Sequence, residues 1–247
     1  MSVLLISELT ISQKEQVRSL LDTCLTFEPV TIEFPLDGAD LYALYEHDKQ
    51  ICSAAAFTKE DDTTYECCAY TAPNFRDHGF FSLILDAAID ELPEDTEFMF
   101  FTDHKSQDTL KVLAAYEAEC VMEEHMMELD TASLEQWILA HPSIDQSNLQ
   151  MEETSPEGTK TFRYQNPFGS VKISVFSSYY YLYGLEIHEN QRGKGLGTLL
   201  LNQVLKDLFE YKPMPVRLQV SGDNLPALNL YKKTGFHITE TLSCYLY

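Results

Sequence analysis

The clearest chemical signal in this sequence is a glycine-rich segment, Arg192-Gly-Lys-Gly-Leu-Gly197. It follows residues 180–187, whose aromatic and β-branched side chains predict a strand, and it precedes an expected helix over 198–209. Glycines let backbone N–H groups approach a ligand closely, and the start of a helix adds partial positive charge. With the charges of Arg192 and Lys194, the segment is typical of a phosphate or pyrophosphate site.

The spacing of the glycines distinguishes this loop from two common phosphate-binding loops. The dinucleotide fingerprint is Gly-x-Gly-x-x-Gly, and a P-loop ends in Gly-Lys-Ser/Thr, whereas this loop has the form Arg-x-x-Gly-x-Gly. A second motif lies downstream, where Asn224 precedes Tyr231 and the pair Gly235-Phe236. A plain tight turn is the alternative for the loop taken alone, and the second motif argues against it.

Together, the loop and the downstream motif resemble those of the GNAT superfamily, the acyl-CoA-dependent N-acyltransferases. The resemblance runs from about Tyr180 onward and implies acetyl-CoA as cosubstrate. It implies a binding place where the strand ending at Ile187 separates from a strand over 216–220, with one backbone amide polarising the thioester oxygen. The residues that the resemblance assigns to acetyl-CoA binding are Leu185, Ile187, Arg192, Gly193, Lys194, Gly195, Leu196, Gly197, Thr198 and Asn224.

The resemblance also implies catalytic roles. Tyr231 would act as general acid and protonate the departing thiolate after direct attack by a neutral amine. Many members carry a glutamate base five residues before the asparagine, but this chain has Gln219 there, which accepts no proton at neutral pH. Glu186, on the strand beside the expected thioester, is the first candidate for the base; a water chain or a carboxylate of the first half is equally open. Structural alternatives stand beside these roles: Tyr231 as a core tyrosine, Asn224 as a helix cap and Glu186 as a solvated strand residue.

The first half of the chain contains a weaker copy of the same pattern. Arg76, Gly79 and Tyr116 repeat the loop arginine, a loop glycine and the motif tyrosine, with the register kept within one residue. Asp77 and Phe81, however, stand where the second half has the first and last glycines of its loop. A carboxylate would repel pyrophosphate and a phenyl ring would fill its space, so we expect this copy to have lost cofactor binding. Chance similarity between two α/β halves is the alternative.

These patterns predict a mixed α/β fold built from two GNAT-like acyl-CoA N-acyltransferase domains in tandem. We expect a degenerate acidic domain at 1–130, a linker at 131–148 and the acetyl-CoA-binding catalytic domain at 149–247. Among the helices, 12–26 is expected to begin at Ser12 as its cap, with Glu15 three residues on. Other helices are expected at 80–89, 109–117, 132–140 and 225–233, and strands at 3–6, 41–45, 51–57, 64–70, 98–101, 120–127, 171–175, 216–220 and 236–246.

Composition narrows the classes of function. The 247 residues include 17 basic and 39 acidic side chains, a formal net charge of −22, which disfavours binding to nucleic acid. Residues 1–148 hold 7 basic and 30 acidic side chains, whereas 149–247 hold 10 and 9. The six cysteines form no Cys-x-x-Cys pair, so we expect no metal site and a reducing, cytoplasmic setting. The first residues do not have the pattern of a signal peptide, and no apolar run is long enough to span a membrane.

The sequence therefore predicts an N-acetyltransferase that moves an acetyl group from acetyl-CoA to the primary amine of a small molecule. The acidic first half would favour a cationic amine, and a homodimer is possible. Two rivals remain: an acyl-CoA-binding sensor or scaffold without turnover, which Gln219 favours, and an acetyltransferase of protein or peptide amines.

Overall fold

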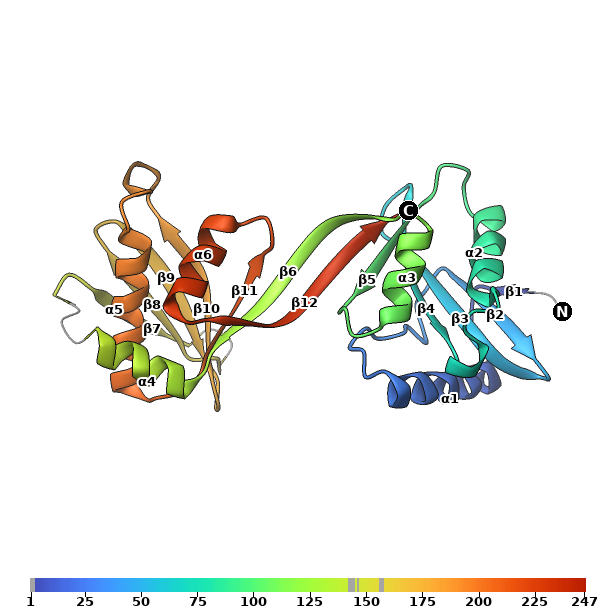
Figure 1. The fold of residues 1–247 in the computed structure, drawn as a ribbon, viewed down its shortest axis with the longest axis horizontal. Helices are drawn as coiled ribbons and strands as arrows, with labels where there is room; N and C mark the ends of the chain where they lie inside the picture. The colour runs from blue at the N-terminus through green and yellow to red at the C-terminus, as the bar shows by residue number, and fades with distance from the viewer. Residues whose placement is uncertain (1–2, 142–144, 146, 156–157) are drawn as a thin grey trace. The chain divides into compact units, whose positions relative to one another are not determined.

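The structure, a computed structural model, describes residues 3–141, 145, 147–155 and 158–247, and it divides into two compact units (Figure 1). Unit 1 comprises residues 1–123 together with 242–247, and unit 2 comprises residues 124–241. Unit 1 has 7 basic and 25 acidic residues and unit 2 has 10 and 14, so most of the excess negative charge belongs to unit 1.

Unit 1 is a six-stranded sheet in the order β1-β2-β3-β4-β5-β12, with helices on both faces. Alternate residues of β2 and β3 enter two different core clusters, and successive side chains of a strand point to opposite faces. Helix α1 supplies Val17 and Leu20 to one cluster, and α2 supplies Ile84 and Leu85 to the other. The elements are β1 (Val3–Ile6), α1 (Ile11–Phe27), β2 (Leu41–His47), β3 (Gln50–Lys59), β4 (Thr64–Thr71), the 3₁₀ helix η1 (Pro73–Phe75), α2 (Phe80–Glu91), β5 (Glu97–Thr102), α3 (Gln107–Ala115) and the start of β6 (Glu119–Leu129).

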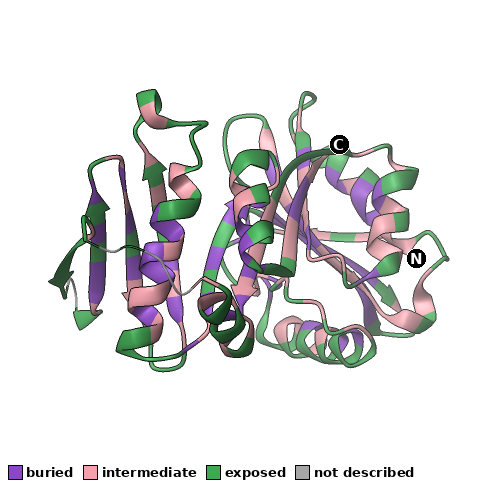
Figure 2. Cartoon of the chain, turned by 60° about the vertical axis from the view of Figure 1, so that its left-hand side comes forward, coloured by how far each residue is buried: buried purple, intermediate pink, exposed green. Residues whose placement is uncertain are grey.

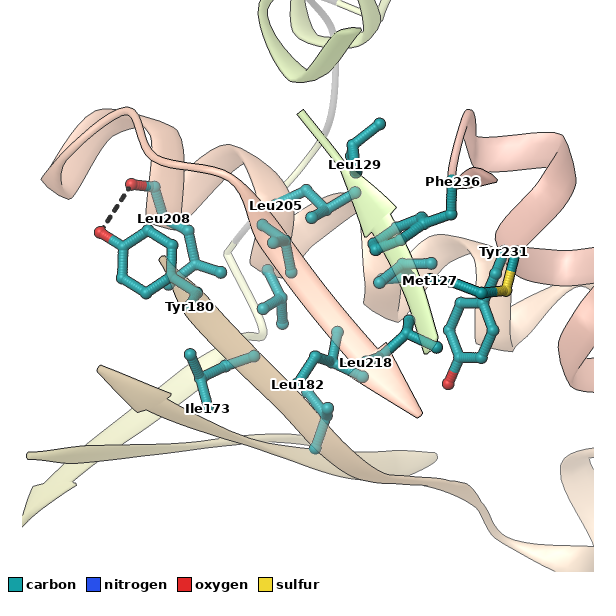
Figure 3. Close-up of a cluster of buried hydrophobic side chains, with 14 of the residues drawn as sticks. Met127, Leu129, Ile173, Tyr180, Leu182, Leu205, Leu208, Leu218, Tyr231 and Phe236 are labelled. Atoms are coloured by element: carbon teal, nitrogen blue, oxygen red, sulfur yellow. Dashed lines mark hydrogen bonds between the residues drawn. The ribbon is translucent and has the colours of Figure 1, made fainter. Parts of the chain in front are cut away.

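Unit 2 is a sheet in the order β6-β11-β10-β9-β8-β7. Its three helices all contribute to one core cluster, through Leu134 of α4, Leu205 of α5 and Leu228 of α6. Figure 3 shows part of this cluster, where Leu205 and Leu208 face side chains of the strands. The elements are α4 (Thr131–Ala140), β7 (Gln150–Thr154), β8 (Thr161–Asn166), β9 (Gly169–Val175), β10 (Tyr180–Ile187), the 3₁₀ helix η3 (Glu189–Gln191), α5 (Leu196–Tyr211), β11 (Val216–Ser221), α6 (Leu225–Thr234) and β12 (His237–Leu246).

One face of the unit 2 sheet therefore lies against helices of that unit and the other does not. On the helix-free face, Lys172, Tyr183 and Arg217 are exposed, whereas their strand neighbours Ile173 and Leu218 are buried. Figure 2 shows the buried residues, in purple, concentrated along the strands and on the helix faces turned toward them.

Two long strands belong to both units. Residues 119–123 of β6 lie in unit 1 and 124–129 in unit 2, while β12 runs from unit 2 into unit 1 at Leu242. In unit 1, β12 pairs with β5 from Ser243↔Thr102 to Leu246↔Met99, and in unit 2, β6 pairs with β11 from Leu129↔Val216 to Glu124↔Ser221. The last strand of unit 1 is thus supplied by residues that follow all of unit 2.

The expected mixed α/β class is confirmed, but the expected boundaries differ from those of the structure. The expected linker at 131–148 begins with helix α4, whose Leu134 is fully buried in the unit 2 core. An apolar residue at that position drives the helix onto the core, so this segment packs as part of a domain. Residues 142–144 and 146 of the expected linker lie outside the described residues. The first helix begins at Ile11, because Thr10 and Gln13, and not Ser12 and Glu15, form the capping box.

Within the described ranges, the helices are too short or too polar to cross a lipid bilayer.

Candidate functional site

Two parallel strands of unit 2 part at one end, and this opening organises the candidate site. Strand β10 pairs with β11 from Tyr180↔Val216 to Leu182↔Leu218. Beyond that pair, β10 continues to Ile187 and β11 to Ser221 with no further pairing between their described residues. Backbone N–H and C=O groups along the second half of β10 are therefore free to bind a ligand on the β11 side.

A bulge in β10 changes which side chains face the core. The pairing with β9 shifts register between Tyr183 and Glu186, and Gly184 adopts a left-handed φ of +60°. Before the bulge, Leu182 is buried in the core; after it, the alternation moves by one residue, so Leu185 and Ile187 pack on the core. Glu186 consequently points to the helix-free face, where it is exposed. Sequence periodicity did not reveal this bulge, although the isolated glycine inside the strand was a signal for it.

The glycine-rich loop forms a turn and an open helix start. Arg192 Nε donates to the Ile187 carbonyl at 3.0 Å, which ties the loop to the end of β10. Gly193 and Gly195 have φ of 73° and 76°, values that L residues seldom adopt. Helix α5 begins at Leu196, two residues before the expected start, and its cap Gly195 has no side chain to bond the first N–H groups. Those N–H groups have no partner within the helix and form a ready site for an anion.

The remaining residues of the loop leave room for such a ligand. A Cβ added to Gly197 would lie 3.6 Å from Ile187 and Leu230 atoms, an ordinary contact distance, so packing within the protein does not require glycine there. Lys194 Nζ donates to the Asn190 carbonyl at 2.9 Å, which holds its charge at the loop. Thr198 in the first turn is exposed.

Asn224 caps helix α6. Its Oδ1 accepts a hydrogen bond from the Ala227 amide at 3.2 Å, so the structural alternative for this residue is realised. The Nδ2 group of this exposed side chain makes no hydrogen bond to the described residues. The helix ends at Thr234 and is capped by Gly235, whose φ of 101° is the left-handed conformation typical of a helix C-cap.

Tyr231 is a buried phenol on α6. The residue is 6% exposed, and its ring packs 5.6 Å from that of Phe236. Figure 3 shows the hydroxyl pointing away from Phe236, at the edge of the core cluster near Met127. Burial raises the pKa of Tyr231 to about 12, because desolvation disfavours the phenolate. The core position and a role as proton donor are compatible, since desolvation alone raises the pKa of Tyr231 and no hydrogen bond from a described residue contributes to it.

Glu186 and Gln219 share the helix-free face on neighbouring strands. Gln219 alternates with the buried Leu218 and Val220 of β11, so it points away from the core and is exposed, like Glu186 on β10. Tyr181 and Tyr183 lie on the same face, with ring centroids 6.2 Å apart. The structure thus places Glu186, the candidate base, and Gln219 on one face of the sheet beside the opening.

Unit 1 repeats this backbone with different side chains. Strand β4 pairs with β5 only from Thr64↔Glu97 to Glu66↔Met99, and Arg76 Nε donates to the Thr71 carbonyl at 3.2 Å, as Arg192 does to Ile187. Gly79 caps α2 with a φ of 77°. The bulge is missing, because β4 pairs with β3 in unbroken register from Thr71 to Tyr65.

The described residues contain no cluster of three or more His, Cys, Asp or Glu side chains arranged to hold a metal ion.

Comparison with known proteins agrees with this geometry. Residues 123–236 match the acetyltransferase (GNAT) family model. The matched segment contains the opening between β10 and β11, the glycine loop and Tyr231. The segment similar to the GNAT acetyltransferase family is therefore residues 123–236, and nearly all of it lies in unit 2.

The individual relatives differ in how much of this chain they match. A mycothiol acetyltransferase of Corynebacterium jeikeium is 35% identical over 24% of this chain, and an N-alpha-acetyltransferase of Sulfurisphaera tokodaii is 40% identical over 25%. The matched regions span 17% and 37% of those two proteins. The solved structure of a tandem GNAT protein from the clavulanic acid biosynthesis pathway covers 100% of this chain and 98% of its own, at 14% identity and a TM-score of 0.60. That likeness shows the fold, and it supports the expected tandem arrangement of two GNAT-like units.

Proposed function

We propose that unit 2 transfers an acetyl group from acetyl-CoA to the primary amine of a small, cationic molecule. The observation that carries the proposal is the opening between β10 and β11 next to an uncapped helix start. Acyl-CoA offers the matching chemistry: an extended amide-bearing arm for the free edge of β10, and a pyrophosphate for the N–H groups of the loop and of the first turn of α5.

The loop and the strand would hold the two ends of acetyl-CoA. Residues 193–198 would bind the pyrophosphate, with Arg192 and Lys194 adding positive charge. Backbone groups of Leu185 and Ile187 would bond to the pantetheine arm, and an amide near the bulge would polarise the thioester oxygen. The Asn224 amide nitrogen would contact the arm, since only its oxygen is engaged in capping α6.

The chemical step is direct attack by the amine nitrogen on the thioester carbon. The new C–N bond forms, the C–S bond breaks, and the thiolate takes the proton of Tyr231. A phenol with a pKa of about 12 holds its proton at neutral pH, so it is ready to act as acid. The proton of the amine would pass to Glu186, directly or through water, on the helix-free face. Acid and base would thus act from different sides of the sheet at its open end.

The acceptor is proposed to be cationic because of the charge of the whole chain. Unit 1 contributes a formal charge of −18 from 7 basic and 25 acidic residues, and a field of that sign concentrates cations near the protein. A bound ammonium would first lose a proton, because only the neutral amine can attack the thioester, and a carboxylate such as Glu186 would accept that proton before the attack.

The loop of unit 1 supplies a precise test. Asp77 holds a φ of 61° at the position of Gly193, which shows that this turn accepts an aspartate. Gly193→Asp should therefore fold, and it should weaken acetyl-CoA binding at least tenfold by repulsion of the pyrophosphate, whereas the neutral isostere Gly193→Asn should weaken it about two- to threefold. Calorimetric titration with acetyl-CoA measures both, and release of the CoA thiol in a panel of primary amines measures turnover. Absence of acetyl-CoA binding to the wild type would overturn the proposal. If acetyl-CoA binds but none of the amines causes release of the CoA thiol, the result would favour the alternative of a non-catalytic acyl-CoA-binding protein.

A further inference from the structure

Unit 1 contains a cavity at the opening between β4 and β5. Its volume is about 470 Å³, enough for a small organic molecule. The side chains along its wall include Phe75, Phe80, Phe81, Phe100, Phe101 and Tyr116. Protein interiors seldom leave spaces of this size unfilled, so an open pocket with aromatic walls indicates a ligand site.

The side of the cavity that corresponds to the anion site of unit 2 is already occupied by carboxylates of the protein. Arg76 Nη1 pairs with Glu28 at 2.6 Å and with Asp108 at 2.9 Å, and the Arg76 and Glu28 side chains are only 17% and 18% exposed. Lys111 pairs with Asp108 at 2.8 Å. In unit 2 the equivalent Arg192 is exposed and makes no ion pair with a described residue. Carboxylates of the protein therefore neutralise the Arg76 charge that would otherwise hold a phosphate in unit 1.

The charge around the cavity has the opposite sign to that of a nucleotide site. Four carboxylates line it, from Glu28, Asp77, Asp103 and Asp108, against the two cations of Arg76 and Lys111. Lys105 pairs with Asp103 at 3.4 Å from outside the lining, so the formal charge of the group is −1. The cysteines in the wall add no positive or nucleophilic character: burial raises the pKa of the Cys68 thiol to about 12 and keeps it neutral.

The acetyl-transfer apparatus is also missing from this opening. The regular pairing of β4 with β3 gives no bulge to aim an amide at a thioester. Tyr116, the counterpart of Tyr231, already donates its hydroxyl to Ser82 Oγ at 2.8 Å. Phe81, in place of the last loop glycine, lies in the cavity wall with its ring 6.0 Å from that of Tyr116. A molecule in this cavity would be bound and not acetylated there.

We propose that the unit 1 cavity binds an amphipathic amine, because its wall is aromatic, its charge is negative and its arginine is already neutralised. Such a molecule has an apolar or aromatic body and one ammonium group, and it carries no phosphate. The body fills the space among the phenylalanines, and the ammonium lies toward the carboxylates of the rim, with Asp77 in the loop as one partner. Coenzyme A does not bind in this cavity, because the carboxylates repel its phosphate groups, and it binds in unit 2 instead.

The test uses the full chain and three probes of one shape: 2-phenylethylamine, 2-phenylethanol and phenylacetate. Titrations are followed by ligand-observed NMR in saturating coenzyme A, which carries no acetyl group and so allows no turnover. The amine should bind at least about fivefold more tightly than the alcohol, and phenylacetate should bind more weakly still. Equal binding of all three probes, or no binding of the amine, would overturn the proposal.

Variants locate the probe. Val112→Trp and Thr109→Phe, two positions of α3 in the wall, should each abolish amine binding by filling the cavity, with far-UV circular dichroism to confirm folding. Asp77→Asn keeps a residue that tolerates the left-handed φ of 61° and should weaken the amine about threefold or more. Asp86→Asn, on an exposed position of α2 outside the cavity, is the matched control and should change nothing. Equal effects of the two asparagine variants, or binding that survives both cavity-filling variants, would place the amine elsewhere and overturn the proposal.

Discussion

Asp77 and Gly193 hold the same left-handed backbone conformation, with φ of 61° and 73°, in equivalent turns of the two units. An L residue in this conformation is strained, and aspartate is among the few that tolerate it. The conformation is therefore a property of the turn, which an arginine fixes in each unit by donating to the last carbonyl of the preceding strand. What differs between the units is the chemistry placed on this common frame.

Tyr231→Phe removes the hydroxyl that we propose as the proton donor and leaves the buried ring in place. We expect kcat to fall by about two orders of magnitude, in the range typical of general acid catalysis, while the Kd for acetyl-CoA and the melting temperature stay close to wild type. Stopped-flow or steady-state thiol release, together with calorimetry, separates these quantities. An unchanged kcat would assign the phenol a purely structural role in the core.

The raised pKa of Tyr231 also has a consequence for stability. The folded-state pKa of about 12 exceeds the ordinary value near 10, so below pH 10 the phenol is neutral in both states and contributes no pH dependence. Above pH 10 the unfolded chain loses the proton first, so stability falls as the pH rises toward 12. Urea unfolding followed between pH 9 and 11.5 should show a steeper loss for wild type than for Tyr231→Phe.

Glu186→Gln tests the base. If Glu186 accepts the amine proton, kcat should fall at least tenfold with little change in acetyl-CoA affinity, whereas Glu189→Gln in the adjacent 3₁₀ helix should be neutral. Because Gln219 shares the helix-free face, adding Gln219→Glu to Glu186→Gln should recover part of the rate. A rate that is insensitive to both changes would point to a water chain as the proton acceptor.

Asp108 makes the stability of unit 1 sensitive to acid. Its hydrogen bonds with Lys111 and Arg76 lower the pKa of its carboxyl below the ordinary value near 4. The stabilisation is therefore complete above that value and is lost as the pH falls through the lowered pKa. In urea titrations that follow the unfolding of unit 1 in the full chain, the free energy of unfolding of the wild type should fall more than that of Asp108→Asn between pH 5 and 2.5. If the two free energies change in parallel with pH, the ion pairs of Asp108 contribute nothing to stability.

Removal of residues 243–247 should destabilise unit 1 in particular, although these residues follow unit 2. The deletion leaves β5 paired only with β4, and it removes the paired bonds between Phe98 and Tyr247, at 2.8 and 3.0 Å, and the buried Cys244. We expect a loss of about 3 kcal/mol or more. Hydrogen exchange should accelerate in β5 and α3 and not in α5, and Glu240→Ala, in the unit 2 part of β12, serves as control.

Some local features of this chain could be predicted from its sequence, whereas its long-range strand pairing could not. The capped end of α6 at Gly235 and the glycine-rich turn before α5 follow from residue types within a few positions of each other. The exchange of β12 between units has no such signature, because a strand's periodicity does not say which strand it pairs with. Asn224 illustrates a third case. Asparagine is suited both to capping a helix and to contacting a ligand, and only the structure shows that the Asn224 oxygen caps α6.

The shared strand β12 also sets an order of events on the ribosome. Residues 1–123 emerge first but lack β12, the antiparallel neighbour of β5, until Ser243–Leu246 have been synthesised. Unit 2, which is continuous over 124–241, has all of its residues earlier. The domain translated first is thus completed last, and until then the nascent chain presents an open edge at β5. A chaperone that protects exposed sheet edges would meet this protein during that interval.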